Sequence, residues 1–131
     1  MTPGDELFRT EYTIRRADLA AYAEASGDHN PIHQDDAAAR AAGLPGVIAH
    51  GMYTMGLAAR AVADWAGGAE RVTGFTARFA KPVVVPADTG ATISITGTVR
   101  KSLDDGAVEV NLTVQCEGTK VLAPARATIH P

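Results

Sequence analysis

The sequence predicts an α+β protein in which an antiparallel sheet of about five strands wraps around one central helix. The first half of the chain spaces its apolar residues at helical intervals, and the second half alternates apolar and polar residues. One helical segment in the first half consists almost entirely of small and apolar residues. A helix without a polar face has to be buried on all sides, and a sheet curved around it achieves this.

The composition is that of an ordinary soluble protein. The 131 residues, of which 46% are apolar and 21% charged, suit one compact domain, and we expect a single domain over residues 1–131. The net charge of −3, the scattered basic residues and the few aromatic residues exclude a basic, base-stacking nucleic-acid surface. No stretch approaches the roughly eighteen apolar residues of a membrane helix, and no signal peptide is visible. With Cys116 as the single cysteine, we expect a cytoplasmic protein.

The first half of the chain is predicted to hold one short strand and three helices. Apolar residues at helical spacing indicate the helices, and a glycine follows the first and closes the second. Thr13 is the candidate cap of the first helix. The third helix contains the small and apolar residues, and we expect almost every face of it to be buried. The segments are a strand around residues 8–14 and helices over residues 16–26, 35–43 and about 51–66.

The second half is predicted to form four strands. Each alternates apolar and polar side chains, which is typical of strands buried on one face. Turn residues separate them, so the sheet is mostly antiparallel, with a hairpin around Glu117-Gly118. Pro124 lacks a backbone donor and must lie at an edge or a bulge. The strands are expected around residues 75–79, 93–99, 108–116 and 121–129.

The most informative segment is residues 26–33, Ser-Gly-Asp-His-Asn-Pro-Ile-His. Pro31 fixes its own backbone and restricts the preceding residue, so we expect an irregular polar loop. This loop carries a carboxylate, Asp28, and an imidazole, His33. A second group, Ala49-His50-Gly51-Met52, opens the third helix, and its oxyanion-binding start is expected to face the loop. Together the two segments predict an acid/base site.

These two segments also carry a family resemblance. The pattern that carries it is Tyr22-(x)3-Ser26-Gly27-Asp28-x-Asn30-Pro31-Ile32-His33, followed by Ala49-His50-Gly51-Met52. It resembles the MaoC-like, or hydratase 2, family over roughly residues 12–86, and the resemblance implies the hot-dog fold. Members are (R)-specific enoyl-CoA hydratases and (3R)-hydroxyacyl-carrier-protein dehydratases. Residues 48–56 are similar to the catalytic subunits of bacterial type II fatty-acid-synthase dehydratases.

Carried over residue by residue, the resemblance implies that Asp28 and His33 are the catalytic pair and hold one water between them. Asn30 would support the loop, and the backbone N–H of Gly51 would receive the thioester carbonyl oxygen. The implied reaction, in fatty-acid metabolism, is the reversible syn hydration of a trans-2-enoyl thioester to a (3R)-3-hydroxyacyl thioester. The acyl carrier is coenzyme A or acyl carrier protein, and no flavin, nicotinamide or metal cofactor is implied.

Two other functions share this architecture. An acyl-thioesterase would not call for the Asp-x-Asn-Pro-x-His loop, and a non-catalytic acyl-binding subunit has no need of both Asp28 and His33. Hot-dog sheets expose long edges, and the family's pockets lie at a dimer interface. We therefore expect a homodimer, or a heterodimer with another hot-dog subunit.

Several residues have a simpler interpretation beside a functional one. His29 and His33 have the spacing of a helical zinc pair, but Pro31 between them argues against the helix that such a pair needs. His50 is interpreted as a structural histidine bonded to backbone at the helix start, and Cys116 as an inert core thiol. Core residues that could also line an acyl tunnel are Met52, Met55 and Trp65. Solvated basic residues that could also meet phosphates or a carrier protein are Arg78, Lys81, Arg100 and Lys101.

Overall fold

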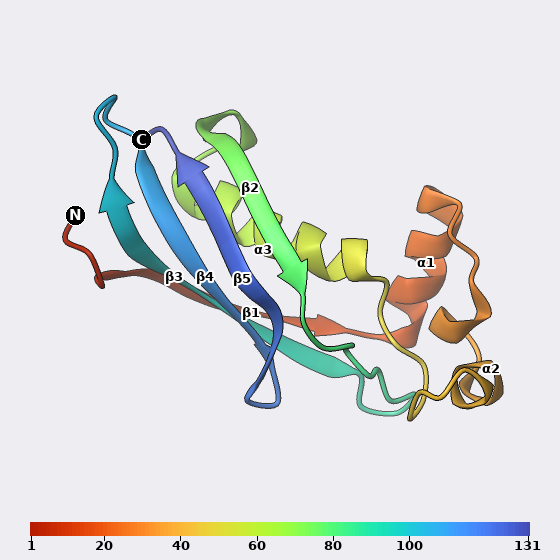
Figure 1. The fold of residues 1–131 in the computed structure, drawn as a ribbon. Coiled ribbons are helices and arrows are strands. Elements are labelled where there is room, and N and C mark those ends of the chain that lie inside the picture. The colour runs from red at the N-terminus through yellow and green to blue at the C-terminus, as the bar shows by residue number, and fades with distance from the viewer.

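A computed structural model describes all 131 residues and contains one five-stranded sheet and three α-helices (Figure 1). The strand order is β1-β3-β4-β5-β2, and all neighbouring strands are antiparallel. This confirms the predicted α+β architecture. The elements are β1 (Glu6–Ile14), α1 (Arg16–Ser26), α2 (Asp36–Ala41), α3 (Gly51–Ala66), β2 (Val72–Phe79), β3 (Ala91–Ser102), β4 (Val108–Cys116) and β5 (Thr119–Ile129), with 3₁₀ turns at Pro31–His33 and Ala69–Arg71.

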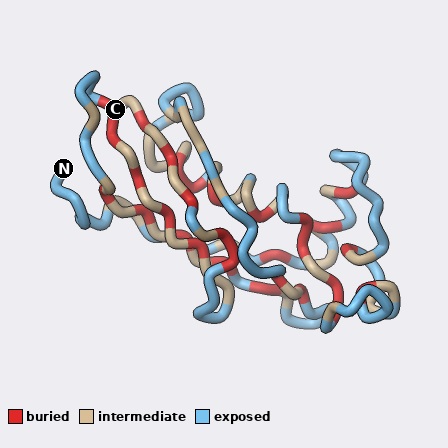
Figure 2. The backbone as a smooth tube through the Cα atoms, in the orientation of Figure 1, coloured by how far each residue is buried: buried red, intermediate tan, exposed pale blue.

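The sheet buries one face, as the alternation of its strands predicts. Along β3 and β4 every second residue is buried, and Figure 2 shows buried and half-buried positions alternating along these strands. The hairpin between β4 and β5 turns at Glu117 and Gly118, whose φ angles are 51° and 76°. Two consecutive left-handed residues suit a tight hairpin turn, because their twist matches that of the flanking strands. The predicted hairpin is therefore confirmed.

Pro124 lies in β5, a central strand between β4 and β2. The β4–β5 register shifts between Asn111 and Val114, and the β2–β5 register shifts between Ala77 and Phe79. The ladders on both sides are thus interrupted where the proline has no N–H to donate. Of the two positions predicted for Pro124, the bulge is the one observed.

The helix α3 packs against one face of the sheet and has the predicted bounds (Figure 1). It buries Thr54, Ala58, Ala61 and Val62, whereas Met52 keeps 59% of its surface exposed. The expectation that almost every face of this helix is buried is therefore wrong for the single chain, because one sheet covers only one side of it. No helix combines the length and the apolar character that a membrane crossing requires.

The helix α1 begins at Arg16 and ends at Ser26, and Gly27, with a φ of 79°, closes it in the left-handed conformation. Thr13 was predicted to cap this helix, and the prediction is wrong. Arg15 precedes the helix, and the Arg15 backbone N–H donates to the carboxylate of Asp18 at 2.8 Å. An acid in the first turn therefore takes the place of a capping side chain.

A cluster of hydrogen bonds ties α1 and α2 to the segment before α3. One oxygen of Asp36 accepts from the Val47 N–H at 3.0 Å and from the Arg16 guanidinium at 3.0 Å. Arg16 also donates through Nε to the Val85 carbonyl at 2.6 Å. The bond from Val47, together with Arg16, holds the pKa of Asp36 below its ordinary value. These bonds fix the path of the chain as it approaches the start of α3.

Candidate active site

The loop after α1 is held by its own side chains. The Asn30 N–H donates to Oδ1 of Asp28 at 3.2 Å, and Oδ1 of Asn30 accepts from the Ile32 N–H at 3.2 Å. The chain then makes the short 3₁₀ turn that ends at His33, within a segment that was predicted to be irregular. Pro31 starts this turn, where a helix needs no N–H and the fixed φ of proline suits the conformation.

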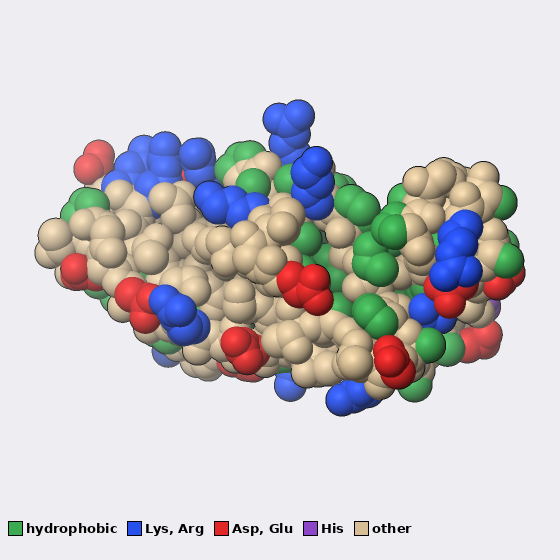
Figure 3. All heavy atoms as spheres, turned by 90° about the horizontal axis from the view of Figure 1, so that it is seen from below, with side chains coloured by type: hydrophobic (Ala, Val, Ile, Leu, Met, Phe, Trp, Pro, Cys, Tyr) green, Lys and Arg blue, Asp and Glu red, His purple; other side chains and the backbone are tan.

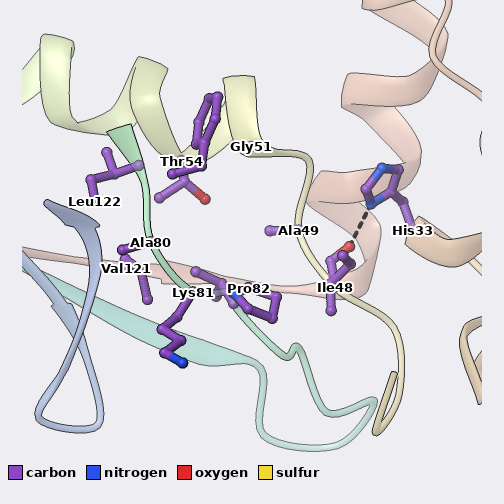
Figure 4. Close-up of a pocket in the computed structure, with 12 residues that line it drawn as sticks. His33, Ile48, Ala49, Gly51, Thr54, Ala80, Lys81, Pro82, Val121 and Leu122 are labelled. Atoms are coloured by element: carbon purple, nitrogen blue, oxygen red, sulfur yellow. Dashed lines mark hydrogen bonds between the residues drawn. The ribbon is translucent and has the colours of Figure 1, made fainter. Parts of the chain in front are cut away.

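This turn places His33 in a buried position next to Asp28. The His33 ring is 8% exposed, and its Nδ1 donates to the Ile48 carbonyl at 2.7 Å (Figure 4). Because a carbonyl can only accept, Nδ1 carries the proton of the neutral ring and Nε2 keeps a free lone pair. A carboxylate oxygen of Asp28 and one ring nitrogen each of His33 and His50 lie within 4.8 Å of one another. One water can bridge such a gap with two hydrogen bonds of about 2.8 Å.

Gly51 is the first residue of α3 and contributes a backbone donor to the site. The Gly51 N–H donates to no protein acceptor, as expected at a helix N-terminus. A Cβ at this position would lie 3.0 Å from the ring of Phe79, so a side chain here would require the exposed Phe79 ring to move by a few tenths of an ångström. The free donor therefore lies beside Phe79 at the positive end of the helix dipole.

Two depressions meet at Gly51 and Phe79. The first is a mostly apolar cavity of about 300 Å³, in which Ile48, Thr54 and Leu122 accompany His33 (Figure 4). The second contains Asp28, His50, Tyr22 and Met52. Gly51 and Phe79 line both depressions, and Phe79 is 54% exposed. A space-filling view shows hydrophobic side chains gathered between the body of the sheet and the lobe of α1 and α2, with charged side chains around them (Figure 3).

His50 is almost completely buried, with 2% of its surface exposed. Its Nε2 donates to the backbone carbonyl of Asp28 at 3.1 Å, and its ring stacks on that of His33 with centroids 3.9 Å apart. The predicted bond to backbone is therefore present, but the acceptor belongs to the Asp28 loop and not to the helix start.

The group of Asp28, His33 and His50 also has the composition of a metal site. However, the two rings are stacked, with only 24° between their planes. The nitrogen lone pairs of stacked rings run side by side, whereas ligands of one metal ion must point at a common centre. His29 lies outside the group, with its side chain 54% exposed and its Nδ1 3.9 Å from Glu24. The geometry suits proton transfer better than metal binding.

The predicted basic residues fall into two classes. Arg100 and Lys101 both lie near Glu109, at 2.9 Å and 3.9 Å, so two positive charges share one carboxylate. Arg78 and Lys81 form no ion pair within the chain, and Lys81 lines the apolar cavity with its ammonium group turned away from it (Figure 4). Of the four, Lys81 is the unpaired residue that lines the cavity.

Of the predicted core residues, Met55 and Trp65 pack against the core and line neither depression. The core assignment of Met52 is wrong, because its side chain projects from the open side of α3 into the second depression. Burial raises the pKa of the Cys116 thiol, in line with the inert thiol that was predicted. Phe79 was predicted only as a strand residue, because nothing in the alternation of β2 distinguishes it.

Comparison with known proteins identifies relatives along most of the chain. The family model described as MaoC like domain matches residues 2–117. The 3-hydroxyacyl-thioester dehydratase Y of Mycobacterium tuberculosis is 40% identical over 114 residues, which cover 72% of this chain and 39% of the relative. Dehydratase X of the same organism is covered over only 26% of its length, so the chain spans well under half of these curated relatives.

Solved structures match over nearly the whole chain. A structure described as a MaoC-like dehydratase superposes with a TM-score of 0.95 and 37% identity, over 99% of this chain and 40% of that one. The R-hydratase PhaJ1 from Pseudomonas aeruginosa superposes with a TM-score of 0.84 and 29% identity, over 99% of this chain and 81% of that one. The chain therefore belongs to the family of MaoC-like domains and has the hot-dog fold.

Proposed function

We propose that this chain, acting as one domain over residues 1–131, catalyses the reversible syn hydration of trans-2-enoyl thioesters to (3R)-3-hydroxyacyl thioesters. The observation that carries the proposal is the approach of an Asp28 carboxylate oxygen and a His33 ring nitrogen to within 4.8 Å of each other, beside Gly51. The dehydratase and hydratase activities in the names of the relatives support the same class of reaction.

In the proposed mechanism, Asp28 and His33 hold one water between them. The water oxygen adds to C3 of the enoyl group, and the water proton passes to the pair, which can accept it because Nε2 of His33 keeps a lone pair. The pair then returns a proton to C2. Because both steps use groups on one loop, they occur on the same face of the double bond, and dehydration follows the same path in reverse.

Gly51 is proposed to stabilise the negative charge that develops on the thioester oxygen. Its N–H has no protein acceptor and stands at a helix N-terminus, where the dipole favours an anion. Asn30 is proposed to support the loop through its bonds to Asp28 and Ile32. The acyl chain would enter the cavity of about 300 Å³, which is at the small end of ligand pockets and favours short chains.

The substrate carrier is proposed to be coenzyme A or acyl carrier protein, contacted by Arg78 and Lys81. We also propose a dimer, with a second copy or another hot-dog subunit covering the exposed Met52 and Phe79 beside the site. The edge strands β1 and β2 offer unpaired backbone groups for such an assembly. A reducing cytoplasm suits the unpaired Cys116.

One assay tests the activity against its two rivals. Crotonyl-CoA is mixed with the chain while the absorbance of the conjugated thioester and the release of free thiol are followed together. We expect the absorbance to fall without thiol release and the product to be the (3R) alcohol. Thiol release would indicate a thioesterase, and binding without either change would indicate a non-catalytic acyl-binding subunit. Light scattering of the same sample tests self-association, and an inactive monomer would indicate a missing heteromeric partner.

A further inference from the structure

We propose that His50 is a positioning residue that holds Asp28 and His33 in place for this reaction. The inference rests on the proposed function. It assigns to His50 the orientation of the two catalytic side chains, in addition to its hydrogen bond to the backbone. His50 lies at the N-terminal boundary of α3 and contacts both members of the proposed catalytic pair.

The first contact anchors Asp28. Nε2 of His50 donates to the Asp28 carbonyl at 3.1 Å, across 22 residues of sequence. The other hydrogen bonds of Asp28 are local, to Ser26 and Asn30. His50 therefore supplies the one hydrogen bond that fixes Asp28 relative to α3 and to the donor of Gly51. Because this bond uses the backbone carbonyl, the carboxylate remains available to water and substrate.

The second contact supports His33. The two rings stack with centroids 3.9 Å apart, and the Tyr22 ring makes an edge contact with His50, with centroids 4.8 Å apart. The His33 ring is thus held on one face by His50 and at Nδ1 by the Ile48 carbonyl. Rotation of this ring would break the bond and the stack together, so its Nε2 keeps a fixed direction.

The hydrogen bond to Asp28 also determines the tautomer of the neutral His50 ring. Because Nε2 donates to a carbonyl, the neutral His50 ring has its lone pair on Nδ1, and this nitrogen is buried without a partner. Nδ1 of His50 therefore makes no hydrogen bond in the site, and the Asp28 carbonyl and the His33 ring are the groups through which His50 acts.

Three variants separate the two contacts. His50→Phe keeps an aromatic face under His33 but removes the donor to Asp28. His50→Gln keeps a donor near the position of Nε2 but removes the ring, and His50→Ala removes both. Val99→Ala is the matched control, because Val99 is a buried core residue on β3 outside the site. Each variant is assayed for crotonyl-CoA hydration, thermal unfolding, and hydrogen exchange of the Asn30, Ile32 and His33 amides.

We expect kcat to fall about 10-fold in the Phe and Gln variants and about 100-fold in the Ala variant, with KM near the wild-type value, because small displacements of reacting groups carry costs of this order. Amide exchange in the loop should accelerate in His50→Phe and His50→Ala but less in His50→Gln. Val99→Ala should lower the melting temperature and leave kcat unchanged.

Wild-type kcat in folded His50→Ala would overturn the proposal, and so would a loss of activity that only follows the loss of folded protein. If His50→Phe or His50→Ala fails to fold, His50→Gln decides the contribution of the ring. A wild-type chain that self-associates and still has no hydratase activity would instead refute the proposed function. The exchange measurement would still decide whether His50 anchors the loop, and unchanged exchange in every folded variant would refute that anchor.

Discussion

The sheet and the site loops are held in place by different interactions. The strands β3, β4 and β5 are ordered by long ladders and by side chains that are fully buried, such as Ile95 and Val110. Residues 26–50 lie outside the five strands, and single hydrogen bonds between backbone and carboxylate, amide or imidazole groups hold the turns between α1, α2 and α3. Substitutions in the sheet should therefore change stability, whereas substitutions of the proposed catalytic pair in the loop should change the rate of the reaction.

The largest effect is expected for the proposed catalytic pair. Asp28→Asn and His33→Ala should each lower the rate of crotonyl-CoA hydration by about 10²–10⁴-fold, because general acid–base catalysis contributes that much. Far-UV circular dichroism and light scattering should show that fold and association are retained. Near-normal turnover in either variant would show that the substituted residue is not catalytic.

The sheet should respond in the opposite way. Ile95→Ala removes a fully buried side chain from β3, and such truncations lower the free energy of unfolding by about 2–5 kcal/mol. Urea unfolding measures this loss, and kcat per folded molecule should match the wild type. A large fall in kcat without a loss of stability would show that sheet and site are not separable in this way.

An acid titration tests how much Asp36, which lies between the sheet and the site loop, contributes to the stability of the fold. The lowered pKa of Asp36 means that its stabilising effect is complete above the ordinary carboxyl value of about 3.9 and is lost as pH falls through the lower folded pKa. Asp36→Asn should therefore melt at a lower temperature than wild type at neutral pH, and the difference should shrink below about pH 4. A constant difference down to pH 2 would contradict the role given to this carboxylate.

The smallest effect is expected at the unpaired basic residues. Lys81→Glu and Arg78→Glu should raise KM for crotonyl-CoA severalfold and leave kcat unchanged, and added salt should reduce the difference because exposed charges are screened. Lys101→Glu is the control, since Lys101 lies on another strand near Glu109. An equal effect of all three substitutions would point to net charge and would argue against a local phosphate contact.

Much of the regular structure could be predicted from the sequence, because its signals are local. The bounds of α1 follow from periodicity and a glycine stop, those of α3 from its apolar residues, and the hairpin at Glu117-Gly118 from turn chemistry. The open side of α3 could not be predicted, since small apolar residues show what can be buried but not what covers them. The cap of α1 was not predicted, because the carboxylate that accepts from the Arg15 N–H belongs to Asp18 in the first turn and not to a residue before the helix.

The residues of the candidate site and the approach of the loop to the start of α3 were predicted, but the contacts that hold them there were not. The loop motif and the glycine after His50 pointed to Asp28, Asn30, His33 and Gly51, whose roles remain predictions. The partners of His50 and the approach of Phe79 to Gly51 depend on contacts between distant segments, which no periodicity encodes. These tertiary contacts are what the structure adds to the sequence.

A crystal structure of Asp28→Asn with crotonyl-CoA would show whether Asp28, His33 and Gly51 meet the substrate as proposed, because the slowed variant should retain the intact substrate. We predict the thioester oxygen at about 2.7–3.1 Å from the Gly51 nitrogen. We also predict that the side chains of residues 28 and 33 face the C2–C3 bond from the same side. A thioester oxygen bound away from Gly51, or a double bond outside the reach of either side chain, would contradict the account.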